Sequence, residues 1–456
     1  MRTGPARAAA ITACMLGAIV LLASCSTTAK KPAGGTTATA PFSPAIPARS
    51  LKAPGCSVAV APARTLAGVP RVMTTVPPGP FGVITSPDGR WVFVSDTLGV
   101  TVLRAAAPGS SPEVVRSVSL PGGQGLGEAL TPDGRYLLVA ASSDTAVLNV
   151  ADLESGSPHA VVGALPGGAG GAGGIEVATS ANGQFVFTSQ EDTAAVEVSN
   201  LSRALSAGFS AAGVTVGRVP VSPAPVGEAV SPDGHWLYVT SELSSSAPLP
   251  GPATRQRCPG DLDAAAGDVR AIDIATAEHD PPVAVRSVAA AGSSPVRVAL
   301  SPDARLAWVT ARGSDALLGF ATSRLTSSAP ALVADVAVGS APVGVILVDG
   351  GRLAVVADSN RFGGRGAQWL SVVNLRDALS ASRHWRGRSR PGPSPGNSPC
   401  PPTAARSMSR TSTAASWRRS TSPISSRRHQ ADALFTRVTL TARGRRSYLV
   451  KYVVPK

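Results

Sequence analysis

The sequence has few of the residues that commonly build a catalytic or metal centre. Aromatic residues make up 4% of the chain, charged residues make up 15%, and there are five His residues. Those His residues show no spacing typical of metal ligands, which argues against a His-based metal motif. No Ser lies in a nucleophile-elbow motif, which argues against a hydrolase of that type. Beyond the N-terminal leader, no uninterrupted apolar run of about 18 residues predicts a membrane-spanning helix.

The chain is rich in turn-forming residues instead. Its 456 residues include 47 Gly and 40 Pro, and 43% of them are hydrophobic. Val, Ala and Thr alternate between these turn residues, which favours an all-β chain over a helical one. The hydrophobic content is enough to bury a sizeable core, in one large repeat domain or in two ordinary domains.

Residues 1–25 are predicted to be a targeting segment, with a basic start and an apolar run over residues 8–23. The run ends in L-A-S-C at Cys25, which resembles a bacterial lipobox. The resemblance implies that Cys25 is diacylated and becomes the first residue of a protein anchored to a bacterial membrane on its extracytoplasmic side. The alternative is an ordinary signal peptide cut near Ala23, with Cys25 incidental. The Ser-, Thr- and Pro-rich residues 26–54 then predict a flexible tether.

The cysteines allow one disulfide. Of the five, three lie in the leader, at the lipid position or in the C-terminal tail. Cys56 and Cys258 remain, and in an oxidising compartment a disulfide between them is chemically allowed. The alternative is two unpaired thiols.

A short turn-and-strand pattern recurs along the chain. Its best copy, Ser231 to Ser241, reads S-P-D-G-H-W-L-Y-V-T-S. Pro fixes φ, Ser or Asp bonds the local backbone, and Gly ends a tight turn. The aromatic and β-branched run that follows predicts a strand. The copies begin at Ser86, Thr131, Ser180, Ser231 and Ser301, with a weaker sixth copy at Asp349.

Each copy belongs to a larger unit of three or four strands. The first five copies start 45, 49, 51 and 70 residues apart. A Gly-containing apolar segment precedes each turn, and a further strand with Asp or Asn near its end follows it. One such antiparallel unit cannot cover both of its faces, so neighbouring units must stack, and radial closure limits their exposed edges.

These repeats resemble the YVTN-repeat β-propellers, a WD40-like family whose hallmark is S-P-D-G-x-x-hydrophobic-Y-V-T-N. The resemblance covers about residues 58–380. It implies that residues 55–382 fold as an all-β propeller, seven-bladed by design. The family includes lactonase-like enzymes, surface proteins and binding proteins, so the resemblance does not specify one function.

Residues 383–456 differ from the rest of the chain. They hold 14 Arg and 2 Lys against a single acid, Asp432, a net charge of +15, so the formal net charge of +14 of the whole chain comes entirely from this tail. One interpretation is a basic, disordered arm that binds an anionic polymer or lipid. We favour a shifted reading frame, because residues 397–412 read in that frame can supply a further turn and strand, L-A-L-S-A-D-G-R-T-L-Y-V-S-N-F. The tail is then predicted to be disordered and the seventh blade disrupted.

The segments before the turns are predicted to be the innermost strands, which line the channel of a propeller. Glu128 and Glu228 occupy matching positions three residues before the turn, and Glu176 and Arg297 sit one residue earlier. A ring of acids could hold a divalent cation through carboxylate oxygens, and no other cofactor is predicted. The alternative is a set of solvated channel-lining charges without a ligand.

Two function classes follow from this reasoning. The first is a non-catalytic binding or scaffolding module that holds an unknown protein or small molecule at a propeller face, and no specific nucleic acid. The second is a lactonase-like hydrolase of a small cyclic ester, which needs an attacking carboxylate or metal-bound water and a donor for the oxyanion. No catalytic residue can be assigned from the family. The insertion over residues 242–268, which carries Cys258, is predicted to form a lid over one mouth of the channel.

Overall fold

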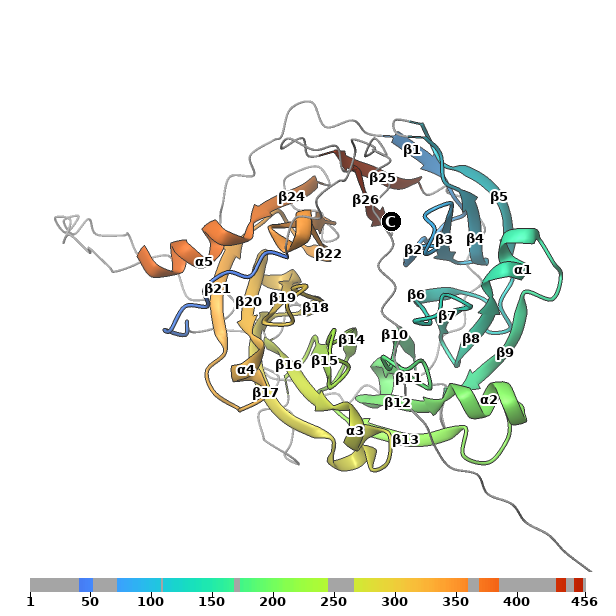
Figure 1. Ribbon diagram of the computed structural model, residues 1–456, viewed down its shortest axis with the longest axis horizontal. Helices are drawn as coiled ribbons and strands as arrows, with labels where there is room; N and C mark the ends of the chain where they lie inside the picture. The colour runs from blue at the N-terminus through green and yellow to red at the C-terminus, as the bar shows by residue number, and fades with distance from the viewer. Residues whose placement is uncertain are drawn as a thin grey trace, which may run out of the picture. The chain divides into compact units, whose positions relative to one another are not determined.

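The computed structural model describes residues 41–51, 72–107, 110–167, 173–244, 266–359, 369–384, 432–439 and 447–453. All of them belong to one compact unit, Pro41–Lys456. Antiparallel sheets surround a central axis, with short helices at the outside (Figure 1). The predicted all-β propeller is therefore confirmed.

Six blades follow one another along the chain, and each keeps its strands in sequence order. The first strand of every blade lies nearest the axis and the last lies at the outside (Figure 1). The strands of the first three blades are β2 (Val83–Thr85), β3 (Trp91–Asp96), β4 (Gly99–Arg104) and β5 (Glu113–Val118); β6 (Gly125–Leu130), β7 (Tyr136–Ala141), β8 (Asp144–Asn149) and β9 (Val161–Pro166); and β10 (Gly174–Thr179), β11 (Phe185–Gln190), β12 (Ala195–Asn200) and β13 (Thr215–Pro220).

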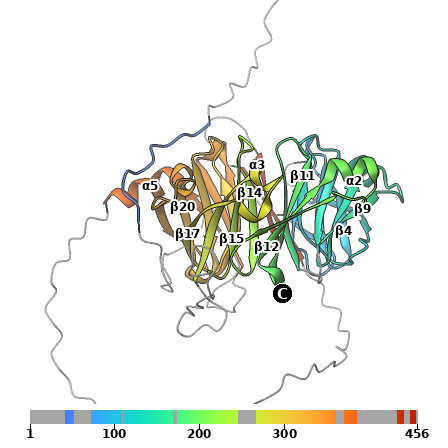
Figure 2. The same ribbon diagram turned by 90° about the horizontal axis from the view of Figure 1, so that it is seen from below.

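The fourth and fifth blades also have four strands, whereas the sixth has three within the described residues. Figure 2 shows the sheets standing side by side, so that each blade covers a face of the next. The strands are β14 (Pro225–Val230), β15 (Trp236–Ser241), β16 (Ala266–Asp273) and β17 (Val285–Ser293); β18 (Pro295–Leu300), β19 (Leu306–Ala311), β20 (Ala316–Ala321) and β21 (Leu332–Ala337); and β22 (Pro342–Val348), β23 (Leu353–Asp358) and β24 (Trp369–Asn374).

A short helix follows the third strand of blades two to six, which the sequence pattern did not predict. In four of these blades the strand ends in Asn or Asp, whose side chain accepts a backbone N–H of the first helical turn at 2.8 to 3.3 Å. The acidic or amide residue near the strand end is therefore a helix N-cap. The helices are α1 (Val150–Ser155), α2 (Leu201–Ala207), α3 (Ile274–Ala277), α4 (Thr322–Leu325) and α5 (Leu375–His384), and the 3-10 turns are η1 (Glu191–Thr193), η2 (Pro281–Val283), η3 (Arg312–Ser314) and η4 (Asp349–Gly351).

The repeated turns have the hydrogen bonds that their residue types predict. Ser231 Oγ donates to Asp233 Oδ1 and accepts the backbone N–H of Trp236 at 2.9 Å. Gly234 has a φ of +74°, in the left-handed region that glycine adopts without strain. The same side-chain contacts recur in the turns that begin at Ser86, Thr131, Ser180 and Ser301.

The core lies between neighbouring blades. The third residue of the second strand is a large side chain in each of the first five blades, and each is at most 1% exposed. One cluster joins Tyr238 of blade four to Val309 and Phe320 of blade five. Burial of these side chains, at about 25 cal/mol per Å² of apolar surface, holds the blades together. The five residues are Phe93, Leu138, Phe187, Tyr238 and Trp308.

A seventh, three-stranded sheet joins segments that are far apart in the sequence. It consists of β1 (Val72–Thr75), β25 (Asp432–Thr439) and β26 (Ser447–Val453), in that order and antiparallel. β26 lies beside β2 of blade one and β22 of blade six (Figure 1). The ring thus has six blades of consecutive strands and an incomplete seventh sheet between the last and the first.

Two of these strands fall in the tail over residues 383–456, which we predicted to be disordered. The structure differs from that prediction over residues 432–439 and 447–453. The physical reason is local composition, because L-F-T-R-V-T and Y-L-V-K-Y-V are rich in β-branched and aromatic residues. β1 supplies an edge with which β25 can pair. Residues 385–431 lie outside the described part of the chain, and the shifted reading frame stays a prediction.

Residues 41–51 lie against blades five and six, although their composition predicts part of a flexible tether over residues 26–54 (blue in Figure 1). Phe42 is 6% exposed, and its backbone N–H donates to the carbonyl of Gly350 at 2.9 Å. Arg324 Nη2 donates to the carbonyl of Pro47 at 2.6 Å. The compact unit therefore begins at Pro41, earlier than the predicted boundary at residue 55.

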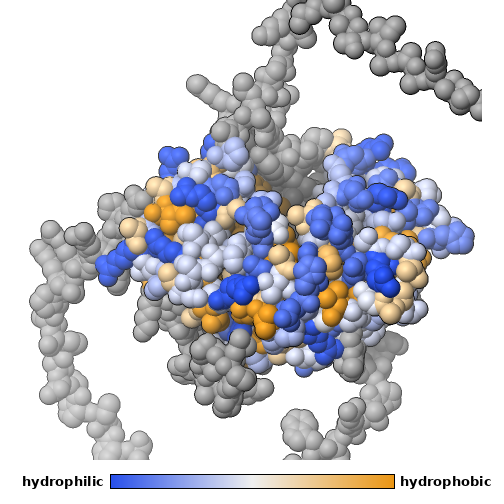
Figure 3. Space-filling view, turned by 60° about the horizontal axis from the view of Figure 1, so that its bottom comes forward, coloured by the Kyte–Doolittle hydropathy of each residue, from blue (hydrophilic) through white to orange (hydrophobic). Residues whose placement is uncertain are grey.

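Exposed hydrophobic side chains are spread over several blades. On the face shown in Figure 3, hydrophobic and hydrophilic residues are intermixed. No helix in the described ranges is long and apolar enough to cross a membrane. Among the described residues, the exposed large hydrophobic side chains are Leu98, Val114, Val162, Leu205, Val283, Val288 and Ile346.

Candidate functional site

The four residues singled out from the repeats lie on the innermost strands of four successive blades. Glu128 is on β6, Glu176 on β10, Glu228 on β14 and Arg297 on β18. The structure brings all four to one cavity of about 320 Å³. The offset from each turn was therefore enough to place them on the channel wall.

A β-bulge lies at or just before the channel-facing residue in these strands. The pairing register shifts between Pro225 and Gly227 in β14, just before Glu228, and between Pro295 and Arg297 in β18. β6 and β10 have the same kind of irregularity. A bulge bends the strand and re-aims the next side chain, which here faces the channel.

The glycine of the pre-turn segment allows neighbouring inner strands to approach closely. A Cβ on Gly227 would lie 2.1 Å from the carbonyl oxygen of Val296 and 2.5 Å from Thr240 Oγ1. Thr240 Oγ1 itself donates to that carbonyl at 3.0 Å, which ties blade four to blade five. A Cβ on Gly127 would likewise lie 2.6 Å from the carbonyl oxygen of Ile175. This close spacing brings charges from different blades within reach of one another.

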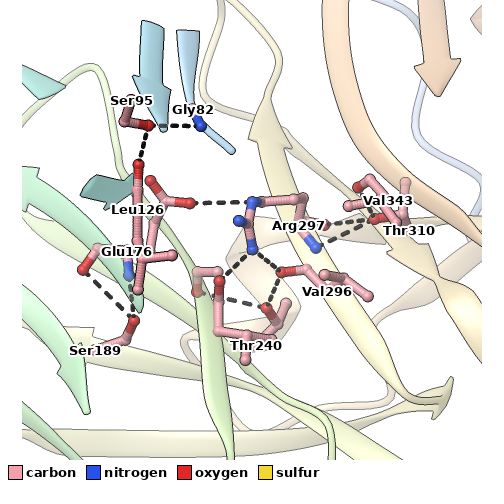
Figure 4. Close-up of polar contacts among 12 residues, drawn as sticks. Gly82, Ser95, Leu126, Glu176, Ser189, Thr240, Val296, Arg297, Thr310 and Val343 are labelled. Carbon is pink, nitrogen blue, oxygen red and sulfur yellow. Dashed lines mark hydrogen bonds and ion pairs between the residues drawn. The ribbon is translucent and has the colours of Figure 1, made fainter. Parts of the chain in front are cut away.

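Arg297 joins several blades at the channel wall (Figure 4). Its Nε lies 3.0 Å from Glu176 Oε2, although Glu176 belongs to blade three and Arg297 to blade five. Its Nη1 donates to the carbonyls of Val226 and Val296, the second at 3.3 Å. The guanidinium carbon lies 5.3 Å from the centre of the Phe81 ring, a cation–π distance. The guanidinium is thus held by contacts to the protein itself.

The two carboxyl groups nearest to Arg297 have raised pKa values. Burial raises the pKa of Glu176, and the Arg297 guanidinium opposes this rise. Burial raises the pKa of Glu228 well above its ordinary value, the Glu176 carboxylate raises it further, and Arg297 opposes both. Both Oε atoms of Glu228 are buried and accept no hydrogen bond from the described residues.

The charged side chains do not fit a divalent cation. Within the described ranges, no group of three or more His, Cys, Asp or Glu residues is placed to hold a metal ion. Arg297 stands among the acids and pairs with Glu176 at 3.0 Å, so a positive charge already occupies this part of the wall. A second, divalent charge there would be repelled by the guanidinium.

Sequence reasoning missed the apolar part of the cavity. Phe81 and Val83 come from blade one, Val343 and Ile346 from blade six, and Leu370 from β24 of the same blade. A signal was present, because Val83 lies three residues before its turn. Glu128 and Glu228 occupy that offset in their own blades, so an apolar residue there indicates an apolar stretch of wall.

A second buried charge network lies at the two ends of the insertion between β15 and β16. Arg270 Nε lies 3.5 Å from Asp268 Oδ1, and Arg270 Nη2 donates to Ser222 Oγ at 2.7 Å. Arg312 Nη2 lies 2.8 Å from Glu242 Oε2. These contacts secure the base of the insertion. The predicted lid itself falls mostly on residues 245–265, which the structure does not describe.

Three of the predicted site residues are outside the described part of the chain. They are the lipid candidate Cys25 and the disulfide candidates Cys56 and Cys258. The lipid attachment and the disulfide therefore stay predictions.

Comparison with known proteins adds the following. No family model matches the chain, and no curated protein matches it. Among solved structures, it is similar to the periplasmic gluconolactonase PpgL of Pseudomonas aeruginosa, with 21% identity and a TM-score of 0.43 over 59% of this chain and 73% of that one. It is also similar to hydrazine synthase of Kuenenia stuttgartiensis, with 17% identity and a TM-score of 0.40 over 68% of this chain and 99% of the other. Similarity at this level carries no argument about function, and the chain is a β-propeller by its own sheet topology.

Proposed function

We propose that this chain is an exported, lipid-anchored β-propeller that acts as a non-catalytic binding module, with the central channel as its ligand site. The cavity of about 320 Å³ carries the proposal, because charged side chains of blades two to five meet apolar side chains of blades one, five and six there. Small-molecule pockets commonly have volumes of about 300–1,000 Å³ and a mixed lining of this kind. The lipobox-like sequence at Cys25 supports export and anchoring.

Ligand binding in the channel is tested with a panel of small probes added to the full chain. The panel contains 2-phenylethylammonium, 2-phenylethanol, 3-phenylpropionate, glucose and δ-valerolactone, and saturation-transfer NMR measures the affinity of each. Ile346 lines the cavity and is 37% exposed, so Ile346→Trp adds bulk to the channel without disturbing the core. We expect at least one probe to bind, and Ile346→Trp to weaken it about tenfold by occupying its space.

The matched control is Leu205→Trp, which adds a similar bulk at an exposed apolar residue of α2, away from the cavity. It should leave probe binding unchanged. Failure of every probe to bind would contradict a channel binding site, and so would binding that Ile346→Trp leaves intact.

The lactonase-like alternative has no specific observation in its favour. An ester hydrolase needs a donor aimed at the developing oxyanion. The Arg297 Nε and Nη1 groups are already engaged by Glu176, Val226 and Val296. Hydrolysis of δ-valerolactone by the full chain, followed in the same NMR samples, is the result that would restore this alternative.

Lipid anchoring is tested by Cys25→Ser. In bacterial cells the unaltered protein should fractionate with membranes and carry the added mass of acyl chains. Cys25→Ser should lose that mass and leave the membrane fraction almost completely, because one residue supplies the acylated thiol. Cys56→Ser is the control and should stay membrane-bound. Retention of Cys25→Ser in membranes with unchanged mass would show that the lipobox-like sequence is not used.

A further inference from the structure

The charges of the channel cavity are not balanced. Three carboxyl groups, Glu128, Glu176 and Glu228, share the cavity with the single guanidinium of Arg297. Arg297 pairs with Glu176 at 3.0 Å, so that these two charges neutralise one another. Carboxyl groups therefore outnumber guanidinium groups among the described residues of the wall, which favours a positively charged guest over a negatively charged one.

Arg297 is poorly placed to attract an anion from solution. Its Nε faces Glu176 and its Nη1 donates to two backbone carbonyls (Figure 4). Its guanidinium lies 5.3 Å from the centre of the Phe81 ring. An anionic ligand would have to displace Glu176, which would leave that carboxylate in the cavity without its ion pair. Glu176 and Arg297 are 15% and 19% exposed, so a carboxylate left there without its partner is only partly solvated, which is destabilising.

Glu228 has the opposite character. Both of its carboxyl oxygens are buried at the cavity wall, and neither accepts a hydrogen bond from the residues the structure describes. Buried polar atoms in folded proteins nearly always have a partner. An N–H donor of a ligand would provide that partner, and a charged donor would provide it most strongly.

The remainder of the wall is apolar. Val83 of blade one and Val343, Ile346 and Leu370 of blade six line the same cavity. A hydrated metal ion is not stabilised by contact with such a surface. A hydrocarbon group is stabilised when it leaves water and packs against it. The wall therefore fits a guest with one polar end and one apolar end.

We infer that the channel selects small organic ammonium compounds, with the ammonium group at Glu228 and Glu128 and an apolar body against the valine and isoleucine side chains of blades one and six. This inference rests on the proposed channel binding site and names the class of its ligand.

The arrangement also couples binding to proton release. Burial and the Glu176 carboxylate raise the pKa of Glu228, while Arg297 opposes them. Glu128, Glu176 and Arg297 are the charged groups that share the cavity with Glu228. An ammonium beside Glu228 favours its carboxylate form, so a carboxyl group that holds a proton at Glu228 releases it to bulk water as the cation binds. Ammonium affinity then increases as the pH rises.

The inference is tested with three probes of similar size that differ in charge. Calorimetry with the full chain at pH 7.5 compares 2-phenylethylammonium, 2-phenylethanol and 3-phenylpropionate. We expect the ammonium to bind at least about tenfold more tightly than the alcohol, and we expect the carboxylate to bind most weakly.

Titrations in buffers of different ionisation enthalpy should show proton release on ammonium binding. Glu228→Gln should weaken the ammonium about tenfold and abolish the proton release, whereas Glu113→Gln, at an exposed carboxylate of β5, should do neither.

The outcomes separate the ligand class from the binding site. Equal binding of ammonium and alcohol, or tighter binding of the carboxylate, would overturn the ammonium assignment and leave the channel site standing. Binding of glucose or δ-valerolactone alone, sensitive to Ile346→Trp, would do the same. Proton release that persists in Glu228→Gln would remove Glu228 from the site. Absence of binding by the entire panel would overturn both proposals.

Discussion

Replacement of Trp308 by alanine is expected to lower the free energy of unfolding by about 3–5 kcal/mol. Trp308 is fully buried in the cluster between blades five and six. It pairs directly with Gly319 on the adjacent strand, and a Cβ on Gly319 would lie 2.8 Å from the indole ring. The indole thus occupies the space that the glycine leaves open. Alanine at position 308 would leave a cavity that no neighbouring side chain can fill.

Urea unfolding followed by far-UV circular dichroism measures this loss, because the substitution removes a fluorophore. Trp91→Ala is the matched control. Trp91 is only partly buried on β3, with Arg104 5.4 Å from its ring centre. Trp91→Ala should lower the free energy of unfolding less than Trp308→Ala does, by about 1 kcal/mol. Equal losses in the two variants would contradict the view that inter-blade packing dominates stability.

Stability should fall as the pH rises from about 4 to about 8, and Asp358→Asn should remove a large part of this fall. Asp358 is fully buried at the end of β23, where burial raises its pKa to about 7. The Asp315 carboxylate also raises this pKa, while Ser371, whose Oγ donates to Asp358 at 2.6 Å, lowers it.

The sign follows from proton binding. The unfolded chain loses the Asp358 proton near pH 4, whereas the folded chain keeps it until about pH 7. The stabilisation is therefore complete below pH 4 and is lost as the pH rises through 7, with an upper limit of about 4 kcal/mol. Asp315, Asp268, Glu176 and Glu228 have raised pKa values too, so Asp358→Asn should retain a smaller pH dependence.

The measurement is the thermal unfolding midpoint at several pH values for the unaltered chain and the variant. Asp88→Asn is the control, because hydrogen bonds led by the Ser86 hydroxyl lower the pKa of Asp88 to about 2. That group is ionised in both states above pH 5, so its replacement should not change the slope between pH 5 and 8. An unchanged slope in Asp358→Asn would show that this carboxyl group ionises in its ordinary range.

The blade repeat could be predicted because its information is local. Ser231, Pro232, Asp233 and Gly234 bond within the turn or to the strand that follows, so the pattern carries the same meaning wherever it recurs. The helices after the third strands were missed for the opposite reason. They are four to ten residues long, too short for a helical period to show. Their N-cap residues, such as Asn149, were the one local signal that remained.

Contacts between distant segments could not be predicted. The Pro- and Ser-rich residues 41–51 have the composition of a tether, yet Arg324 and the pocket that takes Phe42 hold them against blades five and six. β25 pairs with β1 across most of the length of the chain, and β26 pairs with β25. The composition of a segment predicts only whether that segment prefers water when it is alone. These segments are ordered by contacts with residues some 280 to 360 positions away in the sequence.

The sequence by itself determined that the chain is a propeller and that Glu128, Glu176, Glu228 and Arg297 lie on the innermost strands of successive blades, because each of them stands three or four residues before a repeated turn. Only the tertiary structure decided what those places do together. The ion pair between Glu176 and Arg297 joins blades three and five across blade four. Glu228, whose carboxyl oxygens accept no hydrogen bond from the described residues, lines the same cavity as apolar side chains of blades one and six. Both arrangements result from radial closure of the propeller. It brings the inner strands of blades that are distant in sequence to one axis, where their charged and apolar side chains line the same cavity.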